Sequence, residues 1–400
     1  MKAVKPLETN KNILIVSPCF APSTLVGAAR MTSLADFLSQ NGYNVSAVTL
    51  GKAYYPNDLW DRPVPSRVNR MEVSQKGNWT ELMRQKVRTA FAEKHYDACI
   101  LSVGPFETQI FIKKECKRYG IPLILDYRDA WLFYRPYYKG MSRRNRMKAY
   151  IKDAAMLPVE CRNVDYASRV VTVTDSIKSL LTNRYGSKKD KFITILNGHE
   201  DMSDYSSRET GKNTEEYRIG CIGKFIYYNK KIAMELLQAV SELRKNGYNV
   251  QVVHIGEKSD DATELVRETK LDSACYEYAG KQNYQNAMKS LSKMQASVVI
   301  YNFPEGLGTK VFDYIGMNMP IIYAGLLPSE LSQFVSQFKN VIIADNKETL
   351  AAGIKNFIDE KVYTLENTPI QTYSREYQNR KYQELIDDVI LHHSAKQTGK

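Results

Sequence analysis

The chain has 400 residues, of which 43% are hydrophobic and 25% are charged. This length predicts two or three domains, with enough apolar content for a large core in each. The formal net charge of +12 favours nucleic acid, anionic lipid or phosphorylated small molecules as partners. The basic residues are mostly dispersed and form no RNP, zinc-finger or basic-zipper signature, so we expect no nucleic-acid partner.

The cysteines and the N-terminal residues bear on the compartment. The six cysteines are scattered and form no C-x-x-C pair, which argues against a zinc module or a disulfide framework. Residues 1–12 lack the apolar segment of a signal peptide, and no apolar run approaches the roughly 20 residues of a membrane-spanning helix. We therefore expect reduced thiols and a cytoplasmic chain that does not cross a bilayer.

The first half of the chain alternates short apolar strands with amphipathic helices such as 29–41 and 109–119. Gly42 and Gly120 follow these helices at the position where a left-handed residue commonly ends a helix. The alternation predicts a parallel sheet covered by helices. The predicted strands are 12–17, 44–50, 97–103, 122–126, 170–174 and 192–196.

A polar stretch at 200–217 interrupts this pattern and is interpreted as a linker. The last segment, 373–391, has a charged helical pattern. Two α/β domains in series are the simplest arrangement, and their ligands should gather in the loops that follow the strands. The strands predicted after the linker are 218–222, 250–255, 276–279, 297–302, 320–324 and 341–344.

The loop after strand 297–302 carries the most informative motif, Glu305-Gly-Leu-Gly-Thr-Lys-Val-Phe-Asp313. Gly306 and Gly308 allow the backbone to turn tightly against a ligand, and the start of the following helix favours an anion there. Glu305 lies in the turn and Asp313 about one helical turn inside the helix. Such a pair can hold a sugar and a ribose with a diphosphate between them. A glycine turn with two solvated acids is the alternative.

The motif resembles that of the retaining GT-B glycosyltransferases, especially glycosyltransferase family 4, where two glutamates flank seven residues. Asp313 replaces the second glutamate here. The resemblance extends over about residues 12–392 and implies two Rossmann-like parallel-sheet domains facing a cleft, with a C-terminal helix crossing back to the first domain. The implied divisions are 1–204 for the acceptor domain, 205–374 for the donor domain and 375–400 for that helix.

The resemblance also implies roles for the donor-domain residues. Glu305 would lie near the donor sugar and Asp313 at the ribose. Lys224 and Lys230 have the spacing of two basic residues that bind the donor phosphates in the family. The alternative interpretation is a solvated basic loop without a ligand. The remaining donor-binding candidates are Lys281 near the base, and Gly308, Thr309 and Lys310 as backbone donors to the diphosphate.

The first domain contributes further candidates by the same resemblance. In the family, a glycine turn after the first strand faces the donor diphosphate, and Gly27 and Arg30 are the candidates here. The alternative is that this loop is a proline-rich connector and Arg30 a surface arginine of the following helix. The run 126–131 resembles an Asp-x-Arg-Asp-x-Trp element of polysaccharide-type members, with an internal Arg–Asp pair as the alternative. The family's histidine after the third strand is absent. The acceptor-side candidates are Glu107, Asp126, Arg128, Asp129 and Trp131.

One segment, 135–152, has seven basic residues, no acid and several interleaved tyrosines and methionines. This pattern favours docking on an anionic membrane surface, and a solvated helix is the alternative. The basic residues are Arg135, Lys139, Arg143, Arg144, Arg146, Lys148 and Lys152.

The sequence thus predicts a retaining, hexosyltransferase-type enzyme of surface polysaccharide or glycolipid biosynthesis. It would be cytoplasmic, and the basic segment leaves peripheral association with the membrane open. The enzyme would transfer a sugar from a UDP- or GDP-sugar to a saccharide or lipid-linked acceptor. Glu305, Lys224 and Lys230 are the catalytic candidates, with the lysines stabilising the departing diphosphate. We expect no cofactor and no metal, because the sequence has no Asp-x-Asp pair or histidine cluster. A sugar-nucleotide 2-epimerase and a non-catalytic scaffold remain alternatives.

Overall fold

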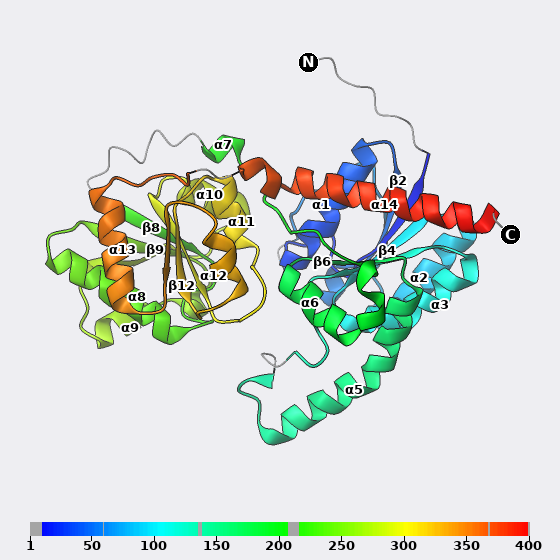
Figure 1. Cartoon of the computed structure of the whole chain (residues 1–400), viewed down its shortest axis with the longest axis horizontal. Helices are drawn as coiled ribbons and strands as arrows, with labels where there is room; N and C mark the ends of the chain where they lie inside the picture. The colour runs from blue at the N-terminus through cyan, green and yellow to red at the C-terminus, as the bar shows by residue number, and fades with distance from the viewer. Residues whose placement is uncertain (1–9, 59, 135–137, 207–215, 367–368, 399–400) are drawn as a thin grey trace, which may run out of the picture. The chain divides into compact units, whose positions relative to one another are not determined.

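The computed structural model describes residues 10–58, 60–134, 138–206, 216–366 and 369–398. The chain divides into two compact units (Figure 1). Unit 1 comprises Met1–Asn197 with Glu376–Lys400, and unit 2 comprises Gly198–Arg375. The sequence-based divisions lay between residues 204 and 205 and between 374 and 375. Part of the predicted linker, 207–215, lies outside the described residues.

Unit 1 contains a seven-stranded sheet with the strand order β3-β2-β1-β4-β5-β6-β7, in which every neighbouring pair is parallel. The sequence predicted six of these strands and missed β3. This edge strand buries only Val73, so it lacks the apolar run that marks the central strands. The strands are β1 (Asn12–Val16), β2 (Asn44–Leu50), β3 (Asn69–Val73), β4 (Ala98–Val103), β5 (Leu123–Tyr127), β6 (Arg169–Thr172) and β7 (Phe192–Thr194).

Helices cover both faces of this sheet. One face packs against α1 and α14, and the other against α2, α3, α6 and the end of α5. Tyr382, Ile386 and Val389 of α14 join Ile13 and Ile15 of β1 in one core, which confirms that the C-terminal helix returns to the first domain. These helices are α1 (Val26–Gln40), α2 (Trp79–Glu93), α3 (Gln109–Tyr119), α5 (Arg143–Tyr166), α6 (Asp175–Arg184) and α14 (Arg375–Thr398).

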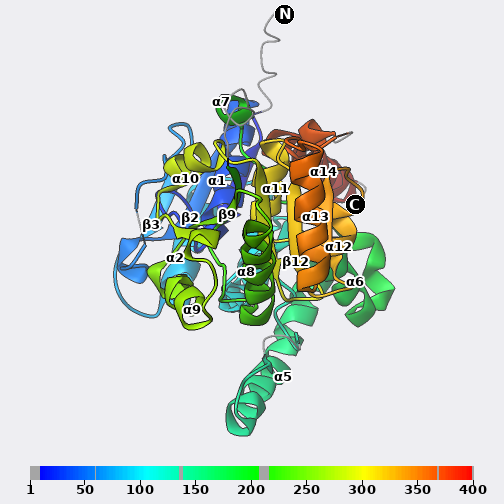
Figure 2. The same cartoon turned by 90° about the vertical axis from the view of Figure 1, so that its left-hand side faces the viewer.

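The first half of α5 is an exception to this packing. In both views it extends away from the sheet of its own unit (Figures 1 and 2). Its buried residues, Glu160, Asn163 and Val164, all lie near its C-terminal end. No helix among the described residues is long and apolar enough to cross a membrane.

Unit 2 contains a six-stranded parallel sheet with the order β10-β9-β8-β11-β12-β13. All six strands were predicted, with β9 and β13 at the predicted bounds. Two doubly wound α/β units therefore confirm the predicted fold class. The strands are β8 (Tyr217–Ile222), β9 (Val250–Ile255), β10 (Tyr276–Tyr278), β11 (Ala296–Tyr301), β12 (Ile321–Gly325) and β13 (Val341–Ala344).

The helices of unit 2 also lie on both faces of the sheet (Figure 2). Helices α8, α9 and α13 share one core with the strands, and α10, α11 and α12 lie across the other face. The strand order reverses between β8 and β11, and the loops after such strands are where doubly wound sheets bind ligands. The helices are α8 (Lys230–Lys245), α9 (Thr263–Glu268), α10 (Tyr284–Leu291), α11 (Lys310–Gly316), α12 (Glu330–Val335) and α13 (Lys347–Asp359).

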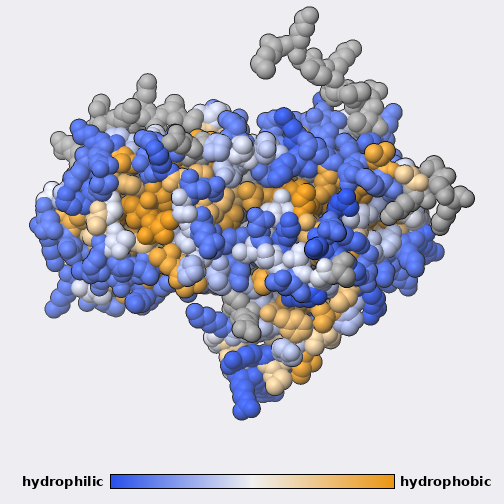
Figure 3. Space-filling view, viewed as in Figure 1, coloured by the Kyte–Doolittle hydropathy of each residue, from blue (hydrophilic) through white to orange (hydrophobic). Residues whose placement is uncertain are grey.

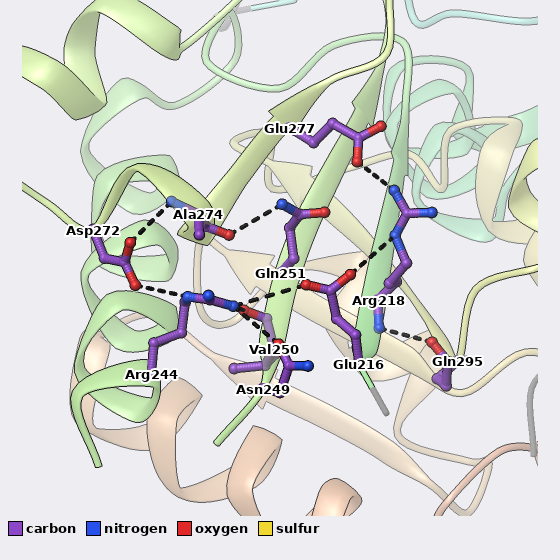
Figure 4. A network of polar contacts seen from close by, with 10 residues as sticks. All are labelled: Glu216, Arg218, Arg244, Asn249, Val250, Gln251, Asp272, Ala274, Glu277 and Gln295. Atoms are coloured by element: carbon purple, nitrogen blue, oxygen red, sulfur yellow. Dashed lines mark hydrogen bonds and ion pairs between the residues drawn. The ribbon is translucent and has the colours of Figure 1, made fainter. Parts of the chain in front are cut away.

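A network of two arginines and three acids holds the amino ends of the unit 2 strands (Figure 4). Arg218 at the start of β8 pairs with Glu277 of β10, and Arg244 of α8 pairs with Asp272 at 2.7 Å. Glu216 lies between the two arginines. These ion pairs stabilise the amino-terminal ends of the strands, whereas the predicted motifs follow the carboxyl-terminal ends.

Candidate functional site

The two motif-bearing loops of unit 2 meet at the point where the strand order reverses. One loop follows β8 and the other follows β11. The Asn302 side chain donates to the Tyr228 carbonyl at 3.2 Å, which joins them. The Lys310 ammonium lies beside Gly223, where an added Cβ would be only 2.4 Å from Nζ. The structure therefore brings the Lys224 loop and the Glu305–Asp313 motif together.

The backbone of the glycine turn has the conformation that its sequence predicts. Gly306 and Gly308 have φ values of +94° and +68°, a region that favours glycine. The Gly306 amide donates to Glu330 Oε2 at 2.6 Å, and the Tyr301 hydroxyl donates to the Glu305 carbonyl at 3.2 Å. These two contacts hold the turn in its shape. Gly308 is exposed, and no atom lies within 4 Å of its Cβ position.

Three lysines surround this junction, and among the described residues none of them forms an ion pair with an acid. Lys224 lies 4.5 Å from the centre of the Tyr227 ring. Lys230 is exposed and begins α8, whose first turn contains no acidic residue. Burial lowers the pKa of the Lys310 ammonium, and Lys224 lowers it further. A site with three such cations attracts an anion with several charges.

Lys281, the candidate for the nucleotide base, follows β10. Its ammonium pairs with Glu257 at 2.8 Å, and Glu257 follows the neighbouring strand β9. The two side chains are about half exposed, so their pairing contributes little to stability. The role of Lys281 at a base stays a prediction.

Sequence reasoning missed His254 and Asp260, which hold the loop after β8. His254 is fully buried, and its Nε2 lies 2.7 Å from the Gly223 carbonyl, so this nitrogen carries the proton. Its Nδ1 accepts from the Tyr276 hydroxyl at 2.9 Å, and burial lowers the pKa of the imidazole. The Asp260 carboxylate accepts from the Phe225 amide. A polar residue inside the apolar run Val-Val-His-Ile was the available sequence signal.

Asp313 has a partner that the sequence did not indicate. The Tyr284 hydroxyl donates to Asp313 Oδ1 at 2.9 Å. Burial raises the pKa of Asp313 to about 6, although Tyr284 and Arg375 act in the opposite direction and Glu200 adds to the rise. The carboxylate is therefore desolvated, and hydroxyl donors of a ligand would stabilise its charged form.

In unit 1, Arg30 and Asp126 form a buried ion pair at 3.0 Å. Arg30 also donates to the Leu196 carbonyl at 2.7 Å, and its guanidinium lies 5.8 Å from the centre of the Tyr382 ring. The sequence left open an arginine–aspartate pair within the run 126–131, but the structure pairs Asp126 with Arg30 of α1 instead. Arg30 is buried, so it is not the surface arginine that was the alternative for it. The roles of Arg30 and Asp126 toward a ligand stay predictions.

The other acceptor-side candidates lie in the loops after β4 and β5. The guanidinium of Arg128 lies between Gly27 and Gly104, and Trp131 donates from Nε1 to the Val103 carbonyl at 3.0 Å. Asp129, the residue after Arg128 in the chain, is partly buried. Glu107 instead pairs with Lys152 of α5 at 2.9 Å.

Helix α5 carries most of the basic segment, whereas Arg135 lies outside the described residues. One side of the helix is fixed to its unit, since Asp153 accepts from the Phe133 amide at 2.8 Å and Lys152 pairs with Glu107. The helix also has exposed apolar residues, one of which, Tyr150, packs its ring on Phe133 with 5.2 Å between the ring centres. Hydrophilic and hydrophobic side chains adjoin on this part of the unit (Figure 3). These exposed apolar residues, the α5 stripe, are Met147 (57% exposed), Tyr150 (56%) and Ile151 (60%).

Within the described residues, no group of three or more His, Cys, Asp or Glu side chains is arranged to hold a metal ion. The junction of the loops after β8 and β11 combines three lysines with the carboxylate of Asp313 and with Glu305 in the glycine turn. Such an arrangement suits a diphosphate that joins a sugar to a nucleoside.

The chain was compared with protein-family models, curated proteins and solved structures. Residues 216–360 match a family model described as Glycosyl transferases group 1, and no curated protein matches. A glycosyltransferase from Rickettsia africae has a TM-score of 0.65 and 14% identity, and the match covers 96% of this chain and 99% of that one. Anabaena HepE in complex with UDP and glucose has a TM-score of 0.61 and 14% identity, with 95% and 100% covered.

A UDP-GlcNAc 2-epimerase from Methanocaldococcus jannaschii is also similar, with a TM-score of 0.58, 12% identity, and 94% of this chain and 99% of that one covered. The chain has the GT-B fold, and the resemblance to GT-B glycosyltransferases is confirmed. The family-model match supports a glycosyltransferase-type function.

Proposed function

We propose that the protein is a retaining glycosyltransferase that moves a hexosyl group from a UDP- or GDP-sugar to a hydroxyl of a saccharide or lipid-linked acceptor. One observation carries the proposal. Lys224, Lys230 and Lys310 surround the junction of the loops after β8 and β11 and, among the described residues, form no ion pair with an acid. A diphosphate would supply the missing negative charge.

Each donor-side residue then has a distinct role. Lys224 and Lys230 balance the charge of the diphosphate, and the amides of Gly308 and Thr309 donate hydrogen bonds to it. Glu305 lies at the donor sugar. The Asp313 carboxylate accepts from the ribose hydroxyls, and Lys281 lies near the base.

The reaction is a displacement on one face of the sugar. The acceptor oxygen forms a bond to the anomeric carbon while the bond from that carbon to the diphosphate oxygen breaks. The acceptor proton passes to the departing diphosphate. Lysine ammonium groups stabilise the charge that develops on this leaving group, a contribution that grows as the bond breaks. We propose that no metal or other cofactor takes part.

Nucleotide binding tests the donor site directly. UDP, GDP, ADP and TDP are titrated separately into the full chain by calorimetry, and one of them should bind. Lys224→Ala should weaken that affinity about tenfold or more, because a charge-assisted contact to phosphate is lost. Lys289→Ala, an exposed lysine of α10, is the matched control and should change nothing. Binding that is indifferent to Lys224→Ala would refute the proposed site.

The similarity to a 2-epimerase keeps isomerisation as the second candidate function. An epimerase changes the sugar nucleotide without any acceptor, whereas a transferase releases nucleoside diphosphate only in proportion to acceptor glycosylated. Incubating the protein with the sugar nucleotide alone and following the sugar by NMR separates the two. An epimerised sugar would favour the isomerase, and a protein that binds no nucleotide would favour the scaffold.

We also propose that the exposed stripe of α5 docks on an anionic bilayer, which fits a role in surface polysaccharide or glycolipid assembly. Arg143, Arg144, Arg146 and Lys148 flank the stripe. Each cation close to anionic lipid contributes on the order of 1 kcal/mol, and buried apolar side chains add to this.

Sedimentation with lipid vesicles tests this surface. The protein should bind phosphatidylcholine vesicles that contain phosphatidylglycerol, bind pure phosphatidylcholine weakly, and dissociate as salt is raised. Met147→Gln with Ile151→Gln should reduce binding severalfold. Ile110→Gln on α3, which is 56% exposed, is the control. Equal binding by all three proteins would exclude the α5 stripe as the docking surface.

A further inference from the structure

The guanidinium of Arg128 occupies space that two glycines leave open. A Cβ at Gly27 would lie 2.1 Å from its Nη1, and a Cβ at Gly104 would lie 2.5 Å from its Nη2. Gly27 follows β1 and Gly104 follows β4, the two strands between which the order of the unit 1 sheet reverses. Arg128 itself follows β5. Its charge is therefore placed where a doubly wound sheet binds ligands.

Among the residues that the structure describes, no hydrogen bond or ion pair reaches this guanidinium, and its Nε is buried without an acceptor. The nearest acid in the preceding strand, Asp126, is already taken by Arg30. The Arg128 side chain as a whole is only partly buried, so a ligand can reach the outer nitrogens. An arginine left unpaired in this way is expected to bind an anion.

The surroundings of Arg128 add to the attraction for an anion. Gly27 lies in the first turn of α1, a helix of fifteen residues whose first turn has no acid and whose N-cap, Leu25, has no side-chain hydrogen bond. The positive end of the helix dipole therefore lies beside the guanidinium. Asp58, which accepts from the Thr24 amide at 3.1 Å just before the helix, balances part of this charge but, among the described residues, forms no ion pair with Arg128. An anionic group of a ligand would compensate the remaining charge better than a neutral sugar hydroxyl would.

The planar fork of arginine matches phosphate oxygens two at a time. We propose that Arg128, with the first turn of α1, binds the phosphate group of the acceptor, so that the acceptor is a saccharide carried on a phosphate or diphosphate. This inference rests on the proposed transferase function, in which the lysines of unit 2 bind the donor diphosphate. It assigns a second, separate phosphate site to unit 1.

A contact within unit 1 connects this site with α5. The loop that begins with Gly104 continues to Glu107, whose carboxylate pairs with Lys152 of α5 at 2.9 Å. The same unit thus offers an anion site and an exposed helix with an apolar stripe. A lipid phosphate satisfies both, since its chain enters the bilayer and its phosphate remains polar.

Geranyl phosphate, a short lipid phosphate, is the probe, titrated by calorimetry into the full chain with UDP titrated separately. Arg128→Gln should lower the affinity for geranyl phosphate about tenfold or more, because a charged group that donates two hydrogen bonds is removed. Arg128→Lys keeps the charge and should lower the affinity less. Gly27→Ala keeps the arginine but displaces its guanidinium, so it should lower the affinity about as much as Arg128→Gln does. Arg162→Gln, at an exposed arginine of α5, should leave binding unchanged.

The UDP arm distinguishes the two sources of phosphate. UDP affinity should change less than about twofold in Arg128→Gln and fall in Lys224→Ala. If Arg128→Gln lowered the affinities for UDP and for geranyl phosphate equally, Arg128 would belong to the donor diphosphate site and the inference would be overturned. So would failure of the folded wild-type protein to bind geranyl phosphate. Binding of geranyl phosphate through Arg128 by a protein that binds no nucleoside diphosphate would support the anion site and refute the proposed function.

Discussion

Replacing Asp313 by Asn removes the charge of a carboxylate that the fold desolvates, while leaving an oxygen that can accept from Tyr284. Burial raises the pKa of Asp313 from an ordinary value of 3.8 to about 6. Because the folded-state pKa is the higher one, the fold favours the protonated acid. Stability from this group is greatest below pH 4 and falls as the pH rises through 6.

The size of the effect follows from the shift. Roughly two pKa units at about 1.4 kcal/mol each amount to about 3 kcal/mol of lost stability at pH 7.5 relative to pH 4. Asp313→Asn does not titrate, so it should be more stable than the wild type by about this amount at pH 7.5. The two proteins should converge near pH 4. The same variant should lose nucleotide affinity, since an amide is a weaker acceptor for ribose hydroxyls than a carboxylate.

Thermal unfolding of both proteins at a series of pH values measures the difference, and each kcal/mol should move the melting temperature by about 2–4 °C. Calorimetry with UDP or GDP supplies the affinity. The wild-type affinity should itself decline as the pH falls below about 6. A stability difference that does not depend on pH would show that Asp313 is not the desolvated acid, and the reasoning would fail. Tyr284→Phe, which removes a hydrogen bond that lowers the pKa, should widen the difference.

Three further outcomes are expected. His254→Phe removes the donor to the Gly223 carbonyl, and should cost about 1–3 kcal/mol of stability and weaken nucleotide binding; an unaffected affinity would exclude a positioning role. Arg30→Met leaves Asp126 charged and buried, and should cost about 3–5 kcal/mol, with recovery when Asp126→Leu is added; no recovery would argue against a purely structural pair. EDTA should leave glycosyl transfer unchanged, and a loss restored by Mg²⁺ would contradict the metal-free mechanism.

The periodicity of the sequence predicted the fold well because buried parallel strands are nearly continuous apolar runs. Strands β2, β9 and β13 have the predicted bounds, and α3 spans the predicted 109–119. The edge strand β3 escaped detection because only one of its residues is buried. The glycine motif predicted a tight turn, and both glycines have positive φ.

The sequence predicted only part of the candidate site. The run 126–131 contains an aspartate and an arginine two residues apart, and the sequence left an internal pair open. The structure pairs Asp126 with Arg30, 96 positions away, and leaves Arg128 without a partner among the described residues. No local pattern distinguishes these two arginines, because the choice depends on the tertiary contact that brings Arg30 of α1 to Asp126 of β5.

The amino-acid sequence was enough to predict most of the strands and helices, the position of the glycine turn, and the lysines that follow β8. These properties depend on residues close together in the chain. Three contacts could be found only in the folded protein: His254 fixes the Lys224 loop, Tyr284 reaches Asp313, and Arg128, which has no partner among the described residues, lies between two glycines. Each of these depends on distant segments being packed together, and burial then sets the charge and hydrogen bonding of the groups that meet.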